Sequence, residues 1–290
     1  MKFGANSFVW TDSFGVKDFD LLPRVKGAGF DGIEIGMLTP TSFPATSFRK
    51  EAERVGLKCT SCCVLPKNSS LLSEDKEARR KARSHIENCL KATADAGGKL
   101  ICGPLYSPVG HFTGVRRTVD EWSRAVEGWQ EIAPLAEKVG VQVALEPLNR
   151  FETYFLNTVA DTADFCDEVD NPNVGILIDT FHANIEEKSI GPAILRAGKH
   201  LKHLHSSESD RGIPGTGNVN WQEFFATIKS IHYNDWLVIE SFGFSLGELS
   251  AAASIWRDLA PIPEAIPFQG VQFLRRMTSQ TKIHEVAGSD

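Results

Sequence analysis

Short apolar runs recur roughly every 30 residues along the chain, and segments with helical periodicity lie between them. The run before Glu146 is nearly continuous rather than alternating with polar residues, which is typical of a parallel strand covered on both faces. Strands that alternate with helices in this way predict a parallel α/β fold. The expected strands lie within residues 3–10, 32–36, 58–65, 99–105, 141–148, 174–182, 201–208 and 235–242.

The segments between the strands carry the usual helix boundary signals. In residues 73–98, polar residues that favour a helix start come first and a Gly-Gly pair ends the segment. Residues 118–140 repeat this arrangement, with Thr118 as the expected N-cap and Gly140 as the stop. We therefore expect long helices in both segments.

Eight such units without a low-complexity linker predict a single-domain, closed (β/α)8 TIM barrel over residues 1–280. An open dinucleotide-binding sheet is not favoured, because the sequence has no Gly-x-Gly-x-x-Gly motif after its first strand. Residues 281–290 show no apolar period, and we expect them to form a C-terminal tail behind the last helix.

Charged residues stand at the ends of the last four predicted strands: Glu146, Asp179, His205 and Glu240. Each of them, taken alone, could cap a helix or form a local salt bridge. In a barrel, however, the carboxyl ends of neighbouring strands face one side of the mouth, where TIM-barrel enzymes place their chemistry. We therefore expect these residues to form one site.

Three carboxylates gathered in a partly dry cavity would repel one another unless a cation lies among them. Oxygen donors with one imidazole favour Mn²⁺, Mg²⁺, Co²⁺ or Fe²⁺ over a thiolate-type zinc site. Four protein ligands on an octahedral ion would leave two positions for adjacent substrate oxygens. The sequence thus predicts a metal site that chelates an α-hydroxy ketone.

Further candidates lie near the predicted mouth. His182 follows Asp179 by three residues, and Glu208 and Arg211 lie in the Gly- and Pro-rich loop after the seventh strand. For Glu34, in the second strand, a supporting salt bridge and a catalytic role are equally compatible with the sequence.

Three of the cysteines crowd into the third strand, where Cys59 and Cys62 have Cys-x-x-Cys spacing. A structural zinc site would need a second pair, and the other cysteines form none. We expect reduced, packed thiols. The chain contains Cys59, Cys62, Cys63, Cys89, Cys102 and Cys166.

The net charge of −6 argues against binding to nucleic acids or to anionic membranes. No apolar run approaches the roughly 20 residues of a membrane span, and the N-terminus lacks a signal peptide pattern. We expect a soluble cytoplasmic protein with a small-molecule partner, no nucleic acid and no membrane.

Five motifs together resemble the ketose 3-epimerases, a group that includes the D-tagatose, D-psicose (D-allulose) and L-ribulose 3-epimerases among the xylose-isomerase-like TIM barrels. The likeness extends from about residue 3 to residue 277, and the motifs occur in order on the predicted strands. They are ALEPLNRFE at 144–152, LIDTFHANIEE at 177–187, HLHSSESDRGIPGTGNVNW at 203–221, VIESF at 238–242 and IWRDLA at 255–260.

The resemblance implies specific roles for residues of this chain. It implies that the same four strand-end residues bind the metal and that two of them, Glu146 and Glu240, are also the acid/base pair. It further implies a substrate-binding set of Glu152, His182, Arg211, Cys63, Asn6 and Phe242. One divalent ion per subunit is implied, with Mn²⁺ expected and Co²⁺ or Mg²⁺ as alternatives, in a homodimer or homotetramer.

The chain departs from the family pattern at a few positions. Glu240 is followed by Ser241 where the family has proline, and Asp210 precedes Arg211 where the family has asparagine. Residues expected at the far end of the sugar, among them Trp10, Phe14 and Tyr106, also differ from better-known members. The core chemistry is therefore expected to be intact, and the sugar preference stays open.

The expected activity is epimerisation of free ketoses at C3, through a metal-bound cis-enediolate with two glutamates acting on opposite faces. The sequence leaves other chemistry on the same barrel open. An aldose-ketose or hydroxypyruvate-type isomerase would move a proton between C1 and C2, and an inosose-type dehydratase would lose water. A sugar sensor without turnover is the alternative from a different class, and a zinc endonuclease would need more histidines than the mouth supplies.

Overall fold

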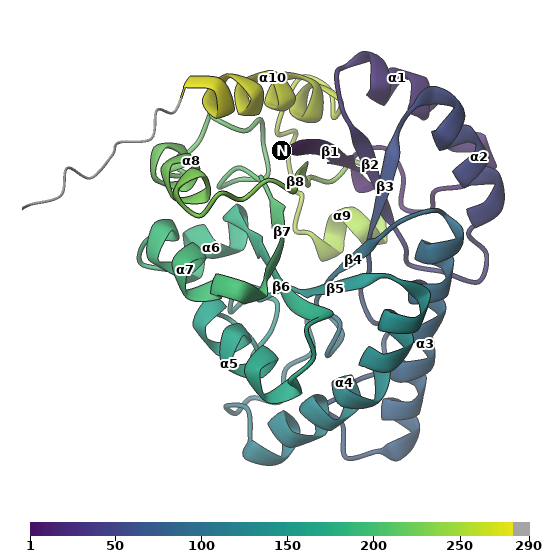
Figure 1. The fold of residues 1–290 in the computed structure, drawn as a ribbon, viewed down its shortest axis with the longest axis vertical. Coiled ribbons are helices and arrows are strands. Elements are labelled where there is room, and N and C mark those ends of the chain that lie inside the picture. The colour runs from purple at the N-terminus through teal and green to yellow at the C-terminus, as the bar shows by residue number, and fades with distance from the viewer. Residues whose placement is uncertain (281–290) are drawn as a thin grey trace, which may run out of the picture.

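The structure, a computed structural model, describes residues 1–280, and the predicted tail at 281–290 lies outside the described residues. Eight parallel strands close into a barrel in chain order, with β1 paired to β8. Figure 1 shows the strands around the centre and the helices outside them. The predicted (β/α)8 barrel is confirmed. The strands are β1 Lys2–Asn6, β2 Gly32–Gly36, β3 Lys58–Cys62, β4 Leu100–Gly103, β5 Gln142–Leu145, β6 Val174–Asp179, β7 Leu201–His205 and β8 Trp236–Ile239.

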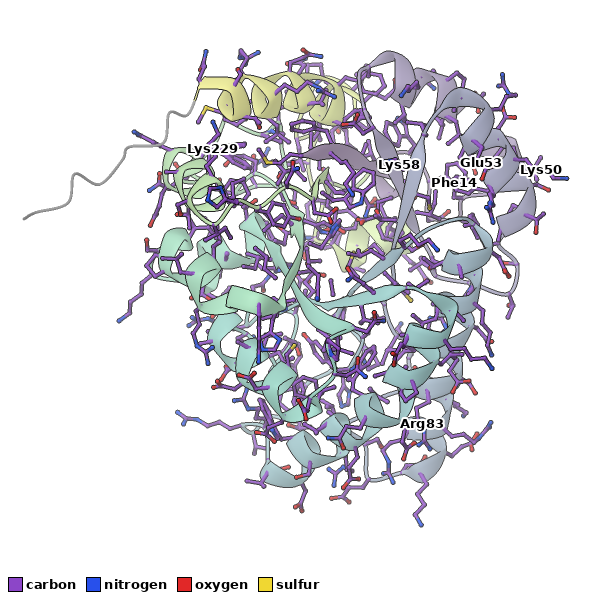
Figure 2. The ribbon with its side chains drawn as sticks, in the orientation of Figure 1. Phe14, Lys50, Glu53, Lys58, Arg83 and Lys229 are labelled. Atoms are coloured by element: carbon purple, nitrogen blue, oxygen red, sulfur yellow. The ribbon has the colours of Figure 1, made fainter. Side chains whose placement is uncertain are left out.

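Most of the helices form the outer layer and cover the strands. Charged side chains of the outer helices, such as Lys50 and Glu53, point into solvent, whereas Phe14 lies in the packed interior (Figure 2). The helices are α1 Leu21–Gly27, α2 Ala45–Val55, α3 Lys76–Asp95, α4 Val119–Val139, α5 Val159–Val169, α6 Thr180–Glu186, α7 Ile190–Ala197, α8 Trp221–Ser230, α9 Glu248–Ala252 and α10 Ala265–Gln280. Within residues 1–280, the short 3-10 helices are Ser7–Val9, Val16–Asp18 and Gly198–His200.

Capping residues fix the ends of the two longest helices as the sequence predicts. The Thr118 hydroxyl accepts the Glu121 amide, and the Glu121 carboxylate accepts the Thr118 amide, which completes a capping box. Gly140 ends α4 with a φ of +68°, a left-handed conformation that glycine adopts without strain. In α3 the Asp75 side chain accepts the Glu77 amide.

The interior consists of two apolar layers. A large cluster fills the space between the strands and the helices and includes Ile33, Ile101 and Trp129. A smaller cluster lies inside the barrel, where Phe8, Cys62, Leu100, Cys102, Ala144 and Leu177 meet. Adjacent residues of a strand belong to different layers because their side chains point to opposite faces.

The segment after β8 returns across the barrel mouth before the last helix begins. It contains α9, which lies near the barrel axis in Figure 1, whereas α10 lies in the outer ring beside α1. Arg275 on α10 donates to the Gly29 carbonyl and so joins the last helix to the end of α1. Across residues 1–280, no helix combines the length and apolar content needed to cross a bilayer.

Candidate metal and sugar site

The four charged strand ends meet at the carboxyl side of the barrel. Asp179 and His205 are the last residues of β6 and β7, and Glu146 and Glu240 directly follow β5 and β8. One ligand atom from each lies within 4.8 Å of those of the other three. All four side chains are buried, so the structure brings the predicted metal ligands together.

The unpaired atoms of this cluster fit a divalent cation. Within the described chain, Glu146 Oε1 and His205 Nδ1 are buried without a hydrogen-bond partner. His205 Nδ1 lies 3.4 Å from Glu240 Oε2 and 3.7 Å from Asp179 Oδ2, which is longer than a normal N–H···O hydrogen bond. Buried polar atoms normally have partners. A hard or borderline ion such as Mn²⁺, Mg²⁺ or Co²⁺ would be a suitable partner for these carboxylate and imidazole atoms.

Burial and mutual repulsion act strongly on the carboxylates. Burial, with Glu240 close by, raises the pKa of Glu146 well above its usual value. Burial also acts to raise the pKa of Asp179, but Arg211 and His205 outweigh it and hold that pKa well below the usual range. A cation would favour the ionised form of both residues.

Glu34 is fully buried and serves as a hydrogen-bond acceptor beneath the cluster. Its Oε1 accepts from Asn6 at 3.0 Å and lies 2.7 Å from His205 Nε2. Its Oε2 accepts from Thr60 at 2.9 Å and lies 2.9 Å from His203 Nε2. Through its contact with Nε2, Glu34 orients the His205 ring so that Nδ1 faces Asp179 and Glu240. The supporting role that the sequence left open is therefore the one the geometry favours.

Arg211 provides the positive charge in the site. Its Nη1 donates to Asp179 at 2.6 Å and to Glu240 at 2.9 Å. The guanidinium also stacks against Phe181 and Phe242, with centroid distances of 4.2 and 5.3 Å. The planar fork of arginine suits both contacts at once.

Glu208 holds the loop that carries Arg211. Its buried carboxylate accepts the backbone amides of Ser209, Gly215 and Val219 and the indole N–H of Trp221. The Arg211 backbone has a φ of +65°, and its carbonyl accepts from Ser241 at 2.7 Å. Glu208 therefore shapes the loop and does not point a free oxygen into the pocket.

His182 is a neutral hydrogen-bond donor in this environment. The Asn149 amide and side chain donate to His182 Nδ1 at 3.1 and 2.9 Å, which assigns the proton to Nε2. Burial, with Arg211 nearby, lowers the pKa of His182 to about 3. Its Nε2 faces Glu146 Oε1 at 3.6 Å and Arg211 Nη2 at 3.2 Å, so two N–H donors meet where a substrate oxygen could bind.

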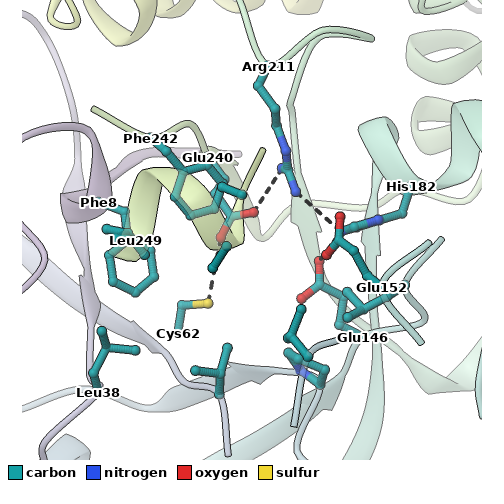
Figure 3. A pocket seen from close by; sticks show the side chains of 16 residues that line it. Phe8, Leu38, Cys62, Glu146, Glu152, His182, Arg211, Glu240, Phe242 and Leu249 are labelled. Atoms are coloured by element: carbon teal, nitrogen blue, oxygen red, sulfur yellow. Dashed lines mark hydrogen bonds and ion pairs between the residues drawn. The ribbon is translucent and has the colours of Figure 1, made fainter. Parts of the chain in front are cut away.

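Glu146, His182, Arg211 and Glu240 line a cavity that opens to solvent. Figure 3 shows Glu240 and Cys62 across the cavity from Glu146, with Glu152 and His182 beside Arg211. Glu152 accepts from Asn149 at 2.9 Å. The remaining wall is largely apolar and includes Phe8, Leu38, Val64, Val109, Leu148, Phe242 and Leu249.

The cysteine that lines the cavity is Cys62, and the predicted assignment of Cys63 to the pocket does not match the structure. The Cys62 thiol lies 3.6 Å from Glu240 Oε1 inside the barrel. Cys63 belongs to the outer layer, where its sulfur lies 3.1 Å from that of Cys89. Adjacent strand-end side chains point to opposite faces, and sequence alone does not fix which one faces inward.

The residues expected at the far end of the sugar do not gather at one place in the structure. Asn6 lies beneath the cavity, where it donates to Glu34 and to Glu240. Tyr106 is buried and donates to the Glu146 carbonyl at 2.9 Å. Trp10 donates to Glu264, and Phe14 packs edge-on against Phe48. The sequence does not predict the cavity-lining residues Phe8, Leu38 and Leu249, because apolar character alone does not distinguish a pocket residue from a core residue.

Comparisons with known proteins agree with this geometry. The family described as a xylose isomerase-like TIM barrel matches residues 22–277. A probable ketose 3-epimerase of Synechocystis sp. is 36% identical over 281 residues, 97% of this chain and 98% of that protein. A D-psicose 3-epimerase of Ruminiclostridium cellulolyticum is 35% identical over 266 residues, 90% of each chain.

Solved structures of this group have the same fold. The crystal structure of a D-allulose 3-epimerase from Methylomonas sp. superposes with a TM-score of 0.91 at 28% identity, and the match covers 96% of this chain and 98% of that one. The agreement in sequence, fold and length identifies the chain as a member of the ketose 3-epimerase group within the xylose isomerase-like TIM barrel family.

Proposed function

We propose that this protein is an enzyme that epimerises free ketoses at C3, using a divalent metal ion and a pair of glutamates. The observation that carries the proposal is the convergence of Glu146, Asp179, His205 and Glu240 at the carboxyl side of the barrel. Two of them, Glu146 and Glu240, also line a solvent-open cavity. The relatives' names support the reaction class, since they include D-psicose and L-ribulose 3-epimerases. Mn²⁺ is the proposed ion, and a cytoplasmic homo-oligomer is the proposed form.

In the proposed mechanism, the two glutamates transfer protons on opposite faces of the bound sugar. Glu146 and Glu240 face the cavity from different sides (Figure 3). Inversion at C3 requires a proton to leave from one face and another to arrive at the other. One glutamate removes the C3 proton, and the second delivers a proton to the opposite face of the cis-enediolate.

The ion would be held by Glu146, Asp179, His205 and Glu240, and when bound it would supply Lewis-acid polarisation of the ketose oxygens. The other polar groups of the cavity bind and orient the sugar. His182 and Arg211 donate N–H groups to oxygen atoms where negative charge develops. Glu152, which is half-buried, accepts a hydrogen bond from a hydroxyl group of the sugar.

The apolar wall excludes water from the reacting centre. Phe8 and Phe242 stack with ring centroids 5.7 Å apart beside the cavity, and Leu249 on α9 lies on the same side. Sites that bind small molecules typically have a largely apolar wall and a few polar groups that point toward the ligand.

The proposal is tested by incubating the purified protein with a panel of free ketoses and identifying the products by NMR, with Mn²⁺ or with EDTA. We expect C3 epimers with Mn²⁺ and none with EDTA. Glu146→Gln and Glu240→Gln should each abolish net turnover, whereas Glu137→Gln, a change at an exposed position of α4, should not. Aldose products or loss of water would contradict the proposal, and so would unchanged turnover in Glu240→Gln.

A further inference from the structure

A second cluster of metal-binding side chains lies outside the sugar cavity. Cys63, directly after β3, faces His85 and Cys89 of α3. The Cys63 sulfur lies 3.1 Å from the Cys89 sulfur and 3.4 Å from His85 Nε2, and the Cys89 sulfur lies 3.6 Å from the same nitrogen. None of these side chains lines the cavity.

The helix supplies two of the three groups from one face. His85 and Cys89 are four residues apart, so their side chains lie one above the other on α3. The third group comes from the neighbouring strand end, where Cys63 points away from the barrel interior. Cys63 N–H donates to the Cys102 carbonyl at 2.9 Å, which fixes the strand end in place.

The spacing of the three atoms is close to that around a tetrahedral zinc ion. Zinc–sulfur bonds of about 2.3 Å and zinc–nitrogen bonds of about 2.0 Å imply S···N separations near 3.5 Å and an S···S separation near 3.8 Å. The observed S···N distances of 3.4 and 3.6 Å agree with this geometry. The sulfur pair at 3.1 Å would open by about 0.7 Å on binding.

The chemical character of the cluster also differs from that of the barrel mouth. Two thiols and one imidazole are soft donors that select Zn²⁺ and similar ions, whereas the carboxylates at the mouth suit harder ones. The hydrogen bond between the two thiols, with His85 nearby and against the effect of burial, lowers the pKa of Cys89 to about 6, whereas the same hydrogen bond and burial raise the pKa of Cys63. Cys89 is therefore the thiolate of the pair, and Cys63 would release its proton when a metal binds. His85 is only partly buried and gives the ion a route from solvent.

We propose that Cys63, His85 and Cys89 form a second metal site that binds Zn²⁺, with water as the remaining ligand. The ion would fasten α3 to the end of β3. The flanking residues of Cys63 are Cys62 and Val64, which both line the sugar cavity. The site therefore stabilises the cavity wall from behind without contacting the sugar.

The proposal is tested with Co²⁺ as a spectroscopic substitute for zinc, added to the reduced full-length protein without oxygen. Thiolate ligands give Co²⁺ an intense charge-transfer absorption that carboxylate ligands do not give. We expect this absorption in the wild type, and we expect excess Zn²⁺ to abolish it. His85→Ala and Cys89→Ser should both lose it while keeping a native circular dichroism spectrum and Mn²⁺-supported activity.

Two further variants separate this site from the barrel mouth. Cys62→Ala removes the neighbouring thiol, and Asp179→Asn disrupts the predicted ligand set at the mouth. Both should keep the charge-transfer absorption. The proposal is overturned if the wild type shows no such absorption, or if it persists in His85→Ala and Cys89→Ser, or if it disappears in Cys62→Ala.

Discussion

Glu34 Oε1 and His205 Nε2 lie 2.7 Å apart at the floor of the barrel mouth. Because Nε2 donates its proton to Glu34, the other ring nitrogen faces Asp179 and Glu240 without a hydrogen-bond partner. When the imidazole is neutral, the carboxylate thus selects the tautomer in which Nδ1 carries no proton and can bind a metal ion.

Replacing Glu34 with Gln should weaken Mn²⁺ binding by about 10–100-fold, because the imidazole loses the charged acceptor that orients it. Calorimetric titration of Mn²⁺ into the metal-free protein measures this directly. Glu137→Gln on the exposed face of α4 serves as the control. Equal Mn²⁺ affinity in Glu34→Gln and wild type would exclude the orienting role.

Metal binding should release protons and strengthen as the pH rises. Burial acts to lower the pKa of His205, but Glu34 and Glu240 outweigh it and hold that pKa well above the usual value. The pKa of Glu146 is raised by burial and by Glu240. Both groups therefore hold protons that compete with the cation below their raised pKa values, and the competition ends above them.

This proton release is measured by repeating the Mn²⁺ titration near neutral pH in buffers with different ionisation enthalpies. The apparent binding enthalpy should vary with the buffer. An enthalpy independent of the buffer, or an affinity that falls with rising pH, would contradict the protonation states described for His205 and Glu146.

Arg211→Ala should destabilise the metal-free protein more than the Mn²⁺-bound one. Removing one partner from a buried ion pair typically costs about 3–5 kcal/mol, and Arg211 pairs with both Asp179 and Glu240. A bound cation would compensate part of that charge. Thermal unfolding with EDTA and with Mn²⁺ compares the two states.

The matched control for this comparison is Arg257→Ala, because Arg257 forms an exposed ion pair with Asp210. Such pairs contribute about 0–1 kcal/mol, so this variant should unfold near the wild-type temperature. If Arg211→Ala lowered the unfolding temperature by the same amount with and without Mn²⁺, a bound cation would not compensate for the lost charge of the guanidinium.

Cys62→Val should lower kcat/KM about 10-fold or more, because added methyl groups in a packed site cost about 1–3 kcal/mol. Cys63→Ala should instead lower the unfolding temperature with little effect on kcat/KM, since its side chain lies in the outer layer. Steady-state kinetics and thermal unfolding of both variants distinguish these effects. A lower kcat/KM in Cys63→Ala and an unchanged one in Cys62→Val would indicate that Cys63 is the pocket residue.

The strand-end residues could be predicted from the sequence because a parallel barrel brings the carboxyl ends of all its strands to one side. With eight parallel strands in a closed barrel, the convergence of Glu146, Asp179, His205 and Glu240 follows from topology. The exact end of a strand does not follow in this way. The third strand was predicted to extend to residue 65, whereas β3 ends at Cys62, and the side-chain direction beyond that point depends on local backbone geometry.

Contacts between residues that are far apart in the sequence could not be predicted from the sequence pattern either. Leu249 reaches the cavity only because the segment after β8 crosses the mouth. The cluster of Cys63 with His85 and Cys89 joins a strand end to a helix. Its residues therefore lack the close sequence spacing of a typical zinc-binding motif. The supporting role of Glu34 depends on hydrogen-bonding neighbours from four other strands, which the sequence pattern does not bring together.

The most direct test of the two-glutamate account is proton exchange at C3 in D2O, followed by NMR with a converted ketose and Mn²⁺. The wild type should place deuterium at C3 of the product epimer. Glu146→Gln and Glu240→Gln should each exchange the C3 proton of only one epimer, a different one in each variant, without interconverting the two. Product formed without deuterium at C3, or exchange of both epimers by one variant, would contradict a two-base mechanism.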